Sequence, residues 1–231
     1  MDRSVRLGLE LPALPDGATS ADVAAWAAVA VAADQAGIGA VWVTGTGHDP
    51  CTLAAGLVGR TDRVTLGVVG DLDGGRHPAV LARDVTCLDL LSGGRSAVLL
   101  TLPADRSDGL AEAVAICRAL FDGDTPHVDG QHYSVAGAVN RPLPTRPGGP
   151  PVFAEGAAHL PVDGLVTTAP ANRIADRRAF ADRAVVWRGS VPDAATADSL
   201  RRAGVDGVIA SVSSAADVGP LAELLLDRWP D

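Results

Sequence analysis

The side chain best suited to proton transfer is His48, which follows the apolar run 40–44. A histidine has a free pKa near neutrality and can act as a general acid or base. We therefore predict His48 as the catalytic residue. A loop histidine that caps the helix expected at Pro50, or that is only solvated, is the alternative interpretation.

Two carboxylates, Asp71 and Asp73, follow the next apolar run, residues 63–70. They could bind a cation or position a substrate. The pattern Asp-x-Asp-Gly-Gly is also typical of a turn, in which a carboxylate accepts hydrogen bonds from nearby backbone N–H groups. Both interpretations stay open.

Other polar side chains share this position just beyond an apolar run. They are Thr44, Thr101, Glu155, Thr167, Thr168, Arg188, Ser211, Ser213 and Ser214. A set of polar groups at the carboxyl ends of strands predicts a rim that binds a small molecule.

These residues must be positioned by eight expected strands that alternate with helices. The strands are expected over residues 5–11, 40–44, 63–70, 96–102, 151–154, 164–168, 184–188 and 207–211. Such alternation favours parallel strands with right-handed crossovers. We predict a single α/β domain, residues 1–231, folded as a trimmed (β/α)8 TIM barrel with a short insertion near residues 122–150. An open doubly wound sheet is the alternative.

One helix organises this pattern, because its start and end are both marked. His77-Pro78 opens it and Gly93 closes it as a left-handed cap. Leu81, Val85, Leu88 and Leu91 are expected to form its buried face. The following Ser-Gly-Gly-Arg precedes a strand, so we interpret Arg95 as structural and not as part of a phosphate loop.

The composition narrows the classes of partner. The chain has 231 residues and a net charge of −9, and all of its basic residues are arginine. An acidic surface disfavours nucleic acid and anionic membranes. No run of about 18 apolar residues occurs, and Glu10 and Pro12 interrupt the apolar stretch near the N-terminus, so we expect neither a membrane span nor a signal peptide.

The three cysteines show no metal-ligand spacing, and we predict no metal site. Cys87 and Cys117 fall among apolar helical positions, which predicts small buried side chains. Reduced cysteines indicate a cytoplasmic protein.

Several stretches resemble the luciferase-like monooxygenases, a family that uses flavin or the deazaflavin coenzyme. The motif RHPAVLAR…LDLLSGGR is similar to the family's helix-to-strand junction. The segment AEAVAICRALFDGD…VDGQHYSVAGA…RPLPTRPGGPPVFAEG resembles its helix, insertion hairpin and fifth strand, and RLGLELP followed by AADQAGIGAVWVTGTGHDP resembles its N-terminal part.

The resemblance implies an oxidoreductase that acts on a small organic substrate with FMN or deazaflavin coenzyme, and a homodimer. His48 would match the family's polar position after the second strand. Residues expected to contact the coenzyme are Thr44, Asp71, Thr101, Gly156, Ala157 and Arg188.

Departures from the family leave a second interpretation open. Glu155 precedes Gly156, residues 100–103 read Leu-Thr-Leu-Pro in place of a glycine-rich strand end, and residues 156–163 are too few for a packed helix. A carboxylate disfavours a nearby phosphate unless an arginine lies between them. A cofactor-free barrel that binds a ligand or partner is therefore the alternative function.

Overall fold

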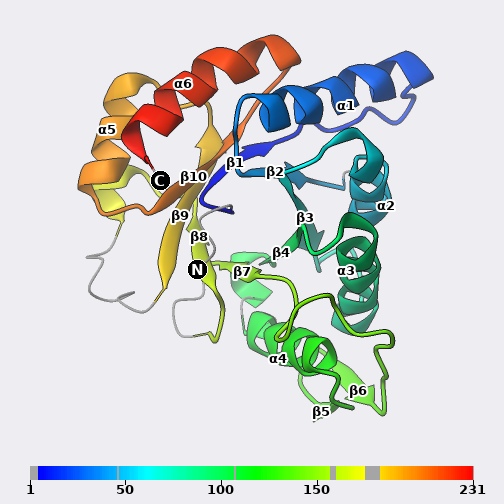
Figure 1. The fold of residues 1–231 in the computed structure, drawn as a ribbon. Coiled ribbons are helices and arrows are strands. Elements are labelled where there is room, and N and C mark those ends of the chain that lie inside the picture. The colour runs from blue at the N-terminus through cyan, green and yellow to red at the C-terminus, as the bar shows by residue number, and fades with distance from the viewer. Residues whose placement is uncertain (1–4, 46, 107, 157–159, 175–182, 231) are drawn as a thin grey trace.

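The computed structural model describes residues 5–45, 47–106, 108–156, 160–174 and 183–230 (Figure 1). Eight parallel strands form a closed barrel in the order β1-β2-β3-β4-β7-β8-β9-β10, with β10 pairing back to β1. The strands are β1 Leu7–Glu10, β2 Ala40–Val43, β3 Thr65–Asp71, β4 Ser96–Thr101, β7 Val152–Glu155, β8 Gly164–Thr167, β9 Ala184–Ser190 and β10 Gly207–Ser211. The predicted (β/α)8 barrel is confirmed, and the open sheet is wrong.

The helices cover the barrel unevenly. They are α1 Ser20–Gln35, α2 Pro50–Ala55, α3 Pro78–Ser92, α4 Gly109–Asp122, α5 Ala194–Arg202 and α6 Val218–Arg228. In Figure 1, α1 to α4 follow one another along one side of the barrel, while α5 and α6 lie over the other. Between β7 and β9 the described residues form no α-helix and only a 3-10 turn at Ala171–Arg173. The predicted trimming of this part of the barrel stays a prediction, because residues 157–159 and 175–182 lie outside the described part of the chain.

An aromatic side chain packs on the outer surface of β9. The ring of Trp187 lies over Gly189, where an added Cβ would come within 2.4 Å of it. The indole N–H of Trp187 donates to the carbonyl oxygen of Ala169, 3.1 Å away. This contact ties the segment after β8 to the strand that follows it.

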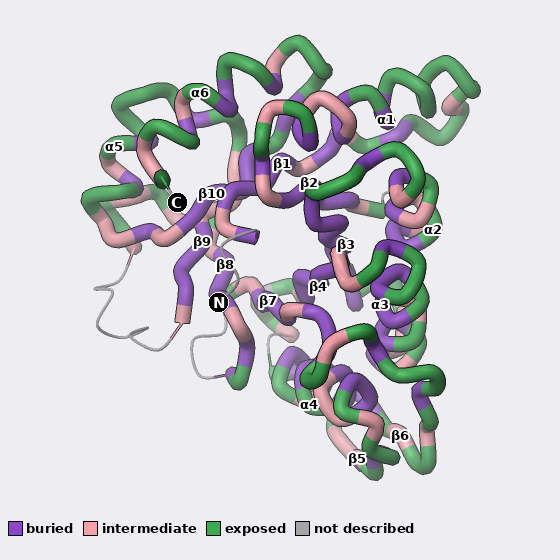
Figure 2. Tube along the Cα trace, viewed as in Figure 1, coloured by how far each residue is buried: buried purple, intermediate pink, exposed green. Residues whose placement is uncertain are grey.

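Two large aromatic rings fill the barrel interior. Trp42 and Phe153 are fully buried and meet edge to face, with ring centroids 5.5 Å apart. Figure 2 shows that buried residues run along the barrel strands. Gly8 and Gly67 leave room for Trp42, because a Cβ at either position would approach the indole to 2.6 or 2.5 Å. Gly164 does the same for Phe153 at 2.5 Å. The interior is a packed core and not a pore.

Helix α3 begins and ends as predicted. Pro78 takes the first helical position, and Gly93 caps the C-terminus with φ +68°. The predicted face is wrong at one residue: Leu91 is 65% exposed, and Ser92 is buried instead. At ~100° per residue, position 92 continues the stripe of Leu81 and Leu88, whereas position 91 lies about 80° away from it.

The amino-terminal end of the barrel is held by a network of buried and half-buried polar groups. Arg95 donates to the carbonyl oxygens of Ser92, Val58 and Val64, with the last distance 2.9 Å. Asp34 accepts the backbone N–H groups of residues 62–64 at 3.0, 2.9 and 2.6 Å. The structural role predicted for Arg95 is confirmed.

The insertion contains a two-stranded hairpin, β5 His127–Asp129 and β6 Ser134–Ala136. The Glu112 carboxylate, on the first turn of α4, accepts the backbone N–H groups of residues 131–133 at 2.8, 3.0 and 2.7 Å. His77, at the start of α3, stacks edge to face with Tyr133. The hairpin is thus attached to two helix N-termini.

Cys51 and Cys117 are buried, and burial raises the pKa of each thiol to about 12. Cys87 is exposed, so its predicted burial is wrong, because it lies on the solvent side of α3. None of the helices in the described part of the chain has the length and apolarity needed to cross a membrane.

Candidate functional site

Three charged side chains meet at the carboxyl end of the barrel. Arg188 forms a two-pronged ion pair with Glu10, in which Nε and Nη2 lie 2.7 and 2.9 Å from the two carboxylate oxygens. Its Nη1 lies 3.4 Å from Oε2 of Glu155. The side chains of Glu10, Arg188 and Glu155 are 14%, 20% and 29% exposed, so we call this half-buried group the mouth cluster.

Strand alternation places the mouth cluster above the packed core. Successive side chains of a strand point to opposite faces, so residues two apart share a face. Glu155 follows the core residue Phe153 by two positions, and Arg188 likewise follows Val186. Glu10 follows Gly8, the residue against which Trp42 packs. The cluster is therefore the next inward layer beyond the core.

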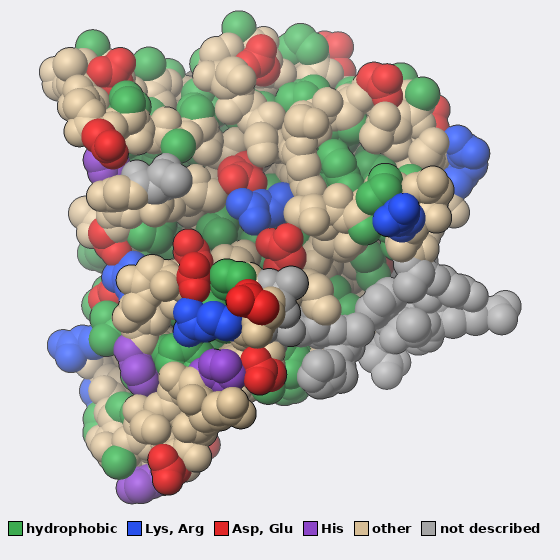
Figure 3. Space-filling model, turned by 180° about the vertical axis from the view of Figure 1, so that it is seen from behind, with side chains coloured by type: hydrophobic (Ala, Val, Ile, Leu, Met, Phe, Trp, Pro, Cys, Tyr) green, Lys and Arg blue, Asp and Glu red, His purple; other side chains and the backbone are tan. Residues whose placement is uncertain are grey.

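The electrostatics of the mouth cluster keep the arginine charged. The hydrogen bonds that Arg188 donates to Glu10 raise the pKa of Arg188 above its ordinary value. The charges of both carboxylates act in the same direction, and burial acts against them. Two carboxylates and one guanidinium give the cluster a formal charge of −1. Figure 3 shows acidic and basic side chains lying side by side on the face opposite to that of Figure 1.

Several predicted site residues lie at the carboxyl ends of β2, β3 and β4. Thr101 ends β4 and is the register partner of Asp71, which ends β3. The Asp71 carboxylate accepts the N–H of Asp73 at 3.0 Å, so the turn interpretation of this motif is confirmed. Thr44 is half-buried directly after β2.

His48 lies half-buried in the connection between β2 and α2. The cap of α2 is Asp49, whose carboxylate accepts the N–H of Thr52 at 2.6 Å. Within the described ranges, no hydrogen bond or ion pair joins His48 to the mouth cluster. Its role in proton transfer stays a prediction.

Gly156 follows β7 with φ +75°, a conformation that favours glycine, and its N–H donates to the carbonyl oxygen of Val166 at 3.1 Å. Ala157, the other predicted coenzyme contact at this position, lies outside the described residues. Glu10 is the member of the mouth cluster that the sequence analysis missed. Its signal is an acidic residue at an alternate position of a buried strand.

A coenzyme phosphate needs free backbone N–H groups at a helix start or an arginine without a partner. The N–H groups of Ser213 and Ser214 donate to Asp217 at 3.1 and 2.8 Å, and Ser214 and Asp217 form a capping box. Gly189 and Ser190, which follow Arg188, belong to strand β9 and not to the start of a helix. Since Arg188 is already paired, these described residues do not fit a phosphate group.

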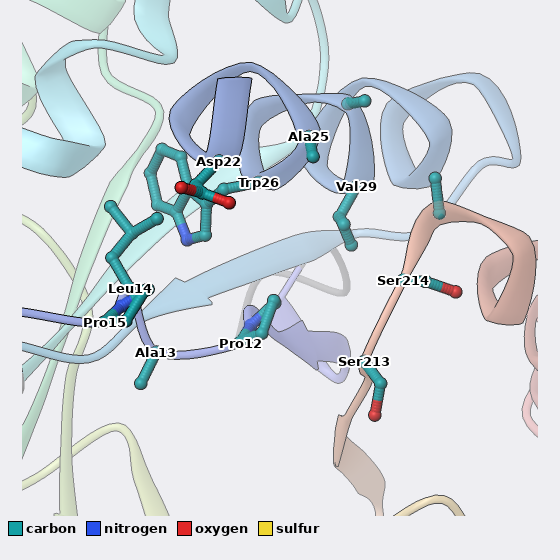
Figure 4. Close-up of a pocket in the computed structure, with 12 residues that line it drawn as sticks. Pro12, Ala13, Leu14, Pro15, Asp22, Ala25, Trp26, Val29, Ser213 and Ser214 are labelled. Carbon is teal, nitrogen blue, oxygen red and sulfur yellow. The ribbon is translucent and has the colours of Figure 1, made fainter. Parts of the chain in front are cut away.

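A separate pocket of about 360 Å³ lies beside the mouth, between the segment after β1, helix α1 and the segment after β10 (Figure 4). Its walls are largely apolar. The lining residues are Pro12, Ala13, Leu14, Pro15, Asp22, Ala25, Trp26, Ala28, Val29, Ser213, Ser214 and Ala215. We call it the α1 pocket.

Comparison with known proteins gives one family match and several similar folds. Residues 6–101 match the family described as luciferase-like monooxygenase. The coenzyme F420 dependent tetrahydromethanopterin reductase from Methanopyrus kandleri aligns with a TM-score of 0.78 and 11% identity, over 97% of this chain and 99% of that one. At these identities the structural match shows the fold.

Two monooxygenases are also similar. RslO1 from Streptomyces bottropensis aligns with a TM-score of 0.60 and 20% identity, over 96% of this chain and 79% of its own. The oxygenating constituent of 3,6-diketocamphane monooxygenase from Pseudomonas putida, a complex with FMN, aligns with a TM-score of 0.57 and 17% identity, over 87% of this chain and 63% of its own. The predicted resemblance is confirmed: residues 6–101 match the luciferase-like monooxygenase family, and the solved structures share the barrel fold.

Proposed function

We propose that the protein is a luciferase-like oxidoreductase that acts on a small organic molecule at the barrel mouth, with reduced FMN or deazaflavin as coenzyme. The observation that carries the proposal is the mouth cluster. Taking charged groups partly out of water costs free energy, and such groups at the carboxyl face of a barrel are candidates for function. The FMN complex and the F420-dependent reductase among the similar structures support this choice of coenzyme.

In this proposal the hydride or oxygen chemistry belongs to the coenzyme, and the protein binds, orients and excludes water. Trp42 and Phe153 form a closed floor that keeps water from entering below. Arg188 and Glu155 orient polar groups of the bound molecules, and His48 transfers protons. Thr44, Asp71, Thr101, Gly156 and Ala157 are the remaining proposed contacts.

A second candidate function is favoured by one specific observation. The groups that could hold a phosphate are already used, because Arg188 is paired with Glu10 and the N–H groups of Ser213 and Ser214 are bonded to Asp217. This supports a cofactor-free barrel that binds a ligand or a partner. For either function we propose a homodimer in the cytoplasm. Light scattering can test whether the protein is a homodimer.

Titration of the purified protein with FMN and with deazaflavin coenzyme separates the two functions. We expect saturable binding of one coenzyme in the micromolar range, and weaker binding by Thr101→Val at the rim. Thr125→Val, on the exposed insertion, is the matched control and should bind as the parent does. No binding of either coenzyme at high micromolar concentration would overturn the oxidoreductase and leave the cofactor-free barrel.

A further inference from the structure

The α1 pocket carries an inference that does not depend on the mouth or on any coenzyme. We propose that it binds a small uncharged molecule with an apolar, preferably aromatic, body and a hydrogen-bond acceptor. The acceptor would receive a hydrogen bond from the indole N–H of Trp26. The pocket volume of about 360 Å³ is at the small end of the ~300–1,000 Å³ range of ligand sites.

Trp26 is the feature that distinguishes this pocket from an ordinary surface depression. Its side chain is only 6% exposed and lines the pocket, with the indole ring hanging below α1 toward Leu14 and Pro15 (Figure 4). A buried indole N–H normally has an acceptor. The half-buried Trp187 and Trp229 follow this rule, donating to backbone carbonyls at 3.1 and 3.0 Å, whereas the N–H of Trp42 inside the barrel core has no partner among the described residues.

In the described part of the chain, the N–H of Trp26 has no such acceptor. This N–H is not fully enclosed by protein, so water in the pocket can reach it, and an acceptor on a bound molecule would replace that water. A carbonyl or ether oxygen would serve as this acceptor. Pro12, Leu14 and Val29 would contact the apolar body of that molecule.

The charge at the pocket edge selects against anions. Asp22 lines the pocket, and its carboxylate accepts from the backbone N–H and hydroxyl of Thr19 at 2.8 and 2.6 Å. These hydrogen bonds lower the pKa of Asp22, so it stays ionised at neutral pH. A carboxylate or phosphate on the ligand would be repelled. The Ser213 hydroxyl at the other edge suits a neutral polar group.

The test compares three probes of similar size by NMR of the 15N-labelled protein, in which each of the four tryptophans gives one indole N–H signal. Acetophenone carries an aromatic ring and an acceptor, ethylbenzene lacks the acceptor, and benzoate is an anion. We expect acetophenone to shift the Trp26 signal saturably, with a Kd of about 1 mM. Ethylbenzene and benzoate should bind about tenfold more weakly or not at all.

Two variants examine the site itself. Trp26→Phe keeps the apolar wall and removes the N–H, so acetophenone should bind about tenfold more weakly. Binding to this variant is followed by the NMR signals of the acetophenone ring. Ala25→Leu, at an exposed position of α1 that lines the pocket, should fill it and abolish binding. Equal binding of acetophenone and ethylbenzene, or an unmoved Trp26 signal, would overturn the proposal. The coenzyme titration is unaffected by either result.

Discussion

Adding one methyl group inside the barrel should destabilise it measurably. In Gly67→Ala, the new Cβ would lie 2.5 Å from two ring atoms of Trp42 and 2.9 Å from a third. Carbon atoms in contact are normally ~3.5–4.0 Å apart, so the ring or the strand must move by about 1 Å. The indole cannot retreat, because its other end meets Gly8 and its edge meets Phe153.

Overpacking a core costs ~1–3 kcal/mol, and the trapped ring argues for the upper end, about 3 kcal/mol. For a chain of this size each kcal/mol lowers Tm by ~2–4 °C, so Gly67→Ala should melt about 6–12 °C lower. Urea denaturation followed by circular dichroism gives the free energy of unfolding, and calorimetry gives Tm. Gly59→Ala is the matched control, since an added Cβ there meets nothing within 4 Å.

A second substitution tests the cause of the loss. In a Trp42→Leu background the indole is gone, and Gly67→Ala should then cost less than about 1 kcal/mol. The difference between the two backgrounds, about 2 kcal/mol, is the coupling between the methyl group and the ring. A Gly67→Ala protein as stable as the Gly59→Ala control would show that the interior is not packed as described.

The remaining predictions concern three carboxylate or histidine side chains. Asp34→Asn should cost about 3 kcal/mol at pH 7, because it weakens three buried or partly buried backbone hydrogen bonds. Burial acts to raise the pKa of Asp34, but these bonds lower it below 3.8. The stability that the ionised Asp34 carboxylate contributes is therefore fully present above about pH 4. This stability is lost as the pH falls through the lowered pKa of Asp34. The difference in the free energy of unfolding between Asp34→Asn and the parent protein should therefore narrow at that pH. A constant difference would contradict this assignment. Glu112→Gln should speed amide exchange at residues 131–133 without changing exchange in the barrel strands; unchanged protection would show that the carboxylate does not hold the hairpin. His48→Ala should lower turnover about 100-fold at unchanged Tm, with His127→Ala as control; equal turnover in both variants would remove His48 from the mechanism.

The fold could be predicted from the sequence because its signals are local and repeated. Apolar runs, helix starts and glycine caps recur along the chain, and parallel strands joined by helices have few ways to assemble. Helix α5 was outside the expected elements, because its buried side reduces to Ala197 and Leu200. Leu91 was misplaced because hydrophobicity alone does not show which side of a helix meets the barrel.

The mouth cluster was only partly predictable for a different reason. Arg188 and Glu155 were recognised by their position at strand ends, but Glu10 pairs with a residue 178 positions away. That pairing exists only because β1 lies beside β10, which in turn lies beside β9. A single sequence gives no measure of such distant neighbours.

The junction between β1 and β10 has a consequence for the growing polypeptide. Leu7 pairs with Val208 and Glu10 with Ser211, so β1 finds one of its two neighbours only after about 200 further residues have been synthesised. Until then its backbone donors and acceptors on that side stay available to other strands. Chains terminated before Gly207 should therefore aggregate during expression.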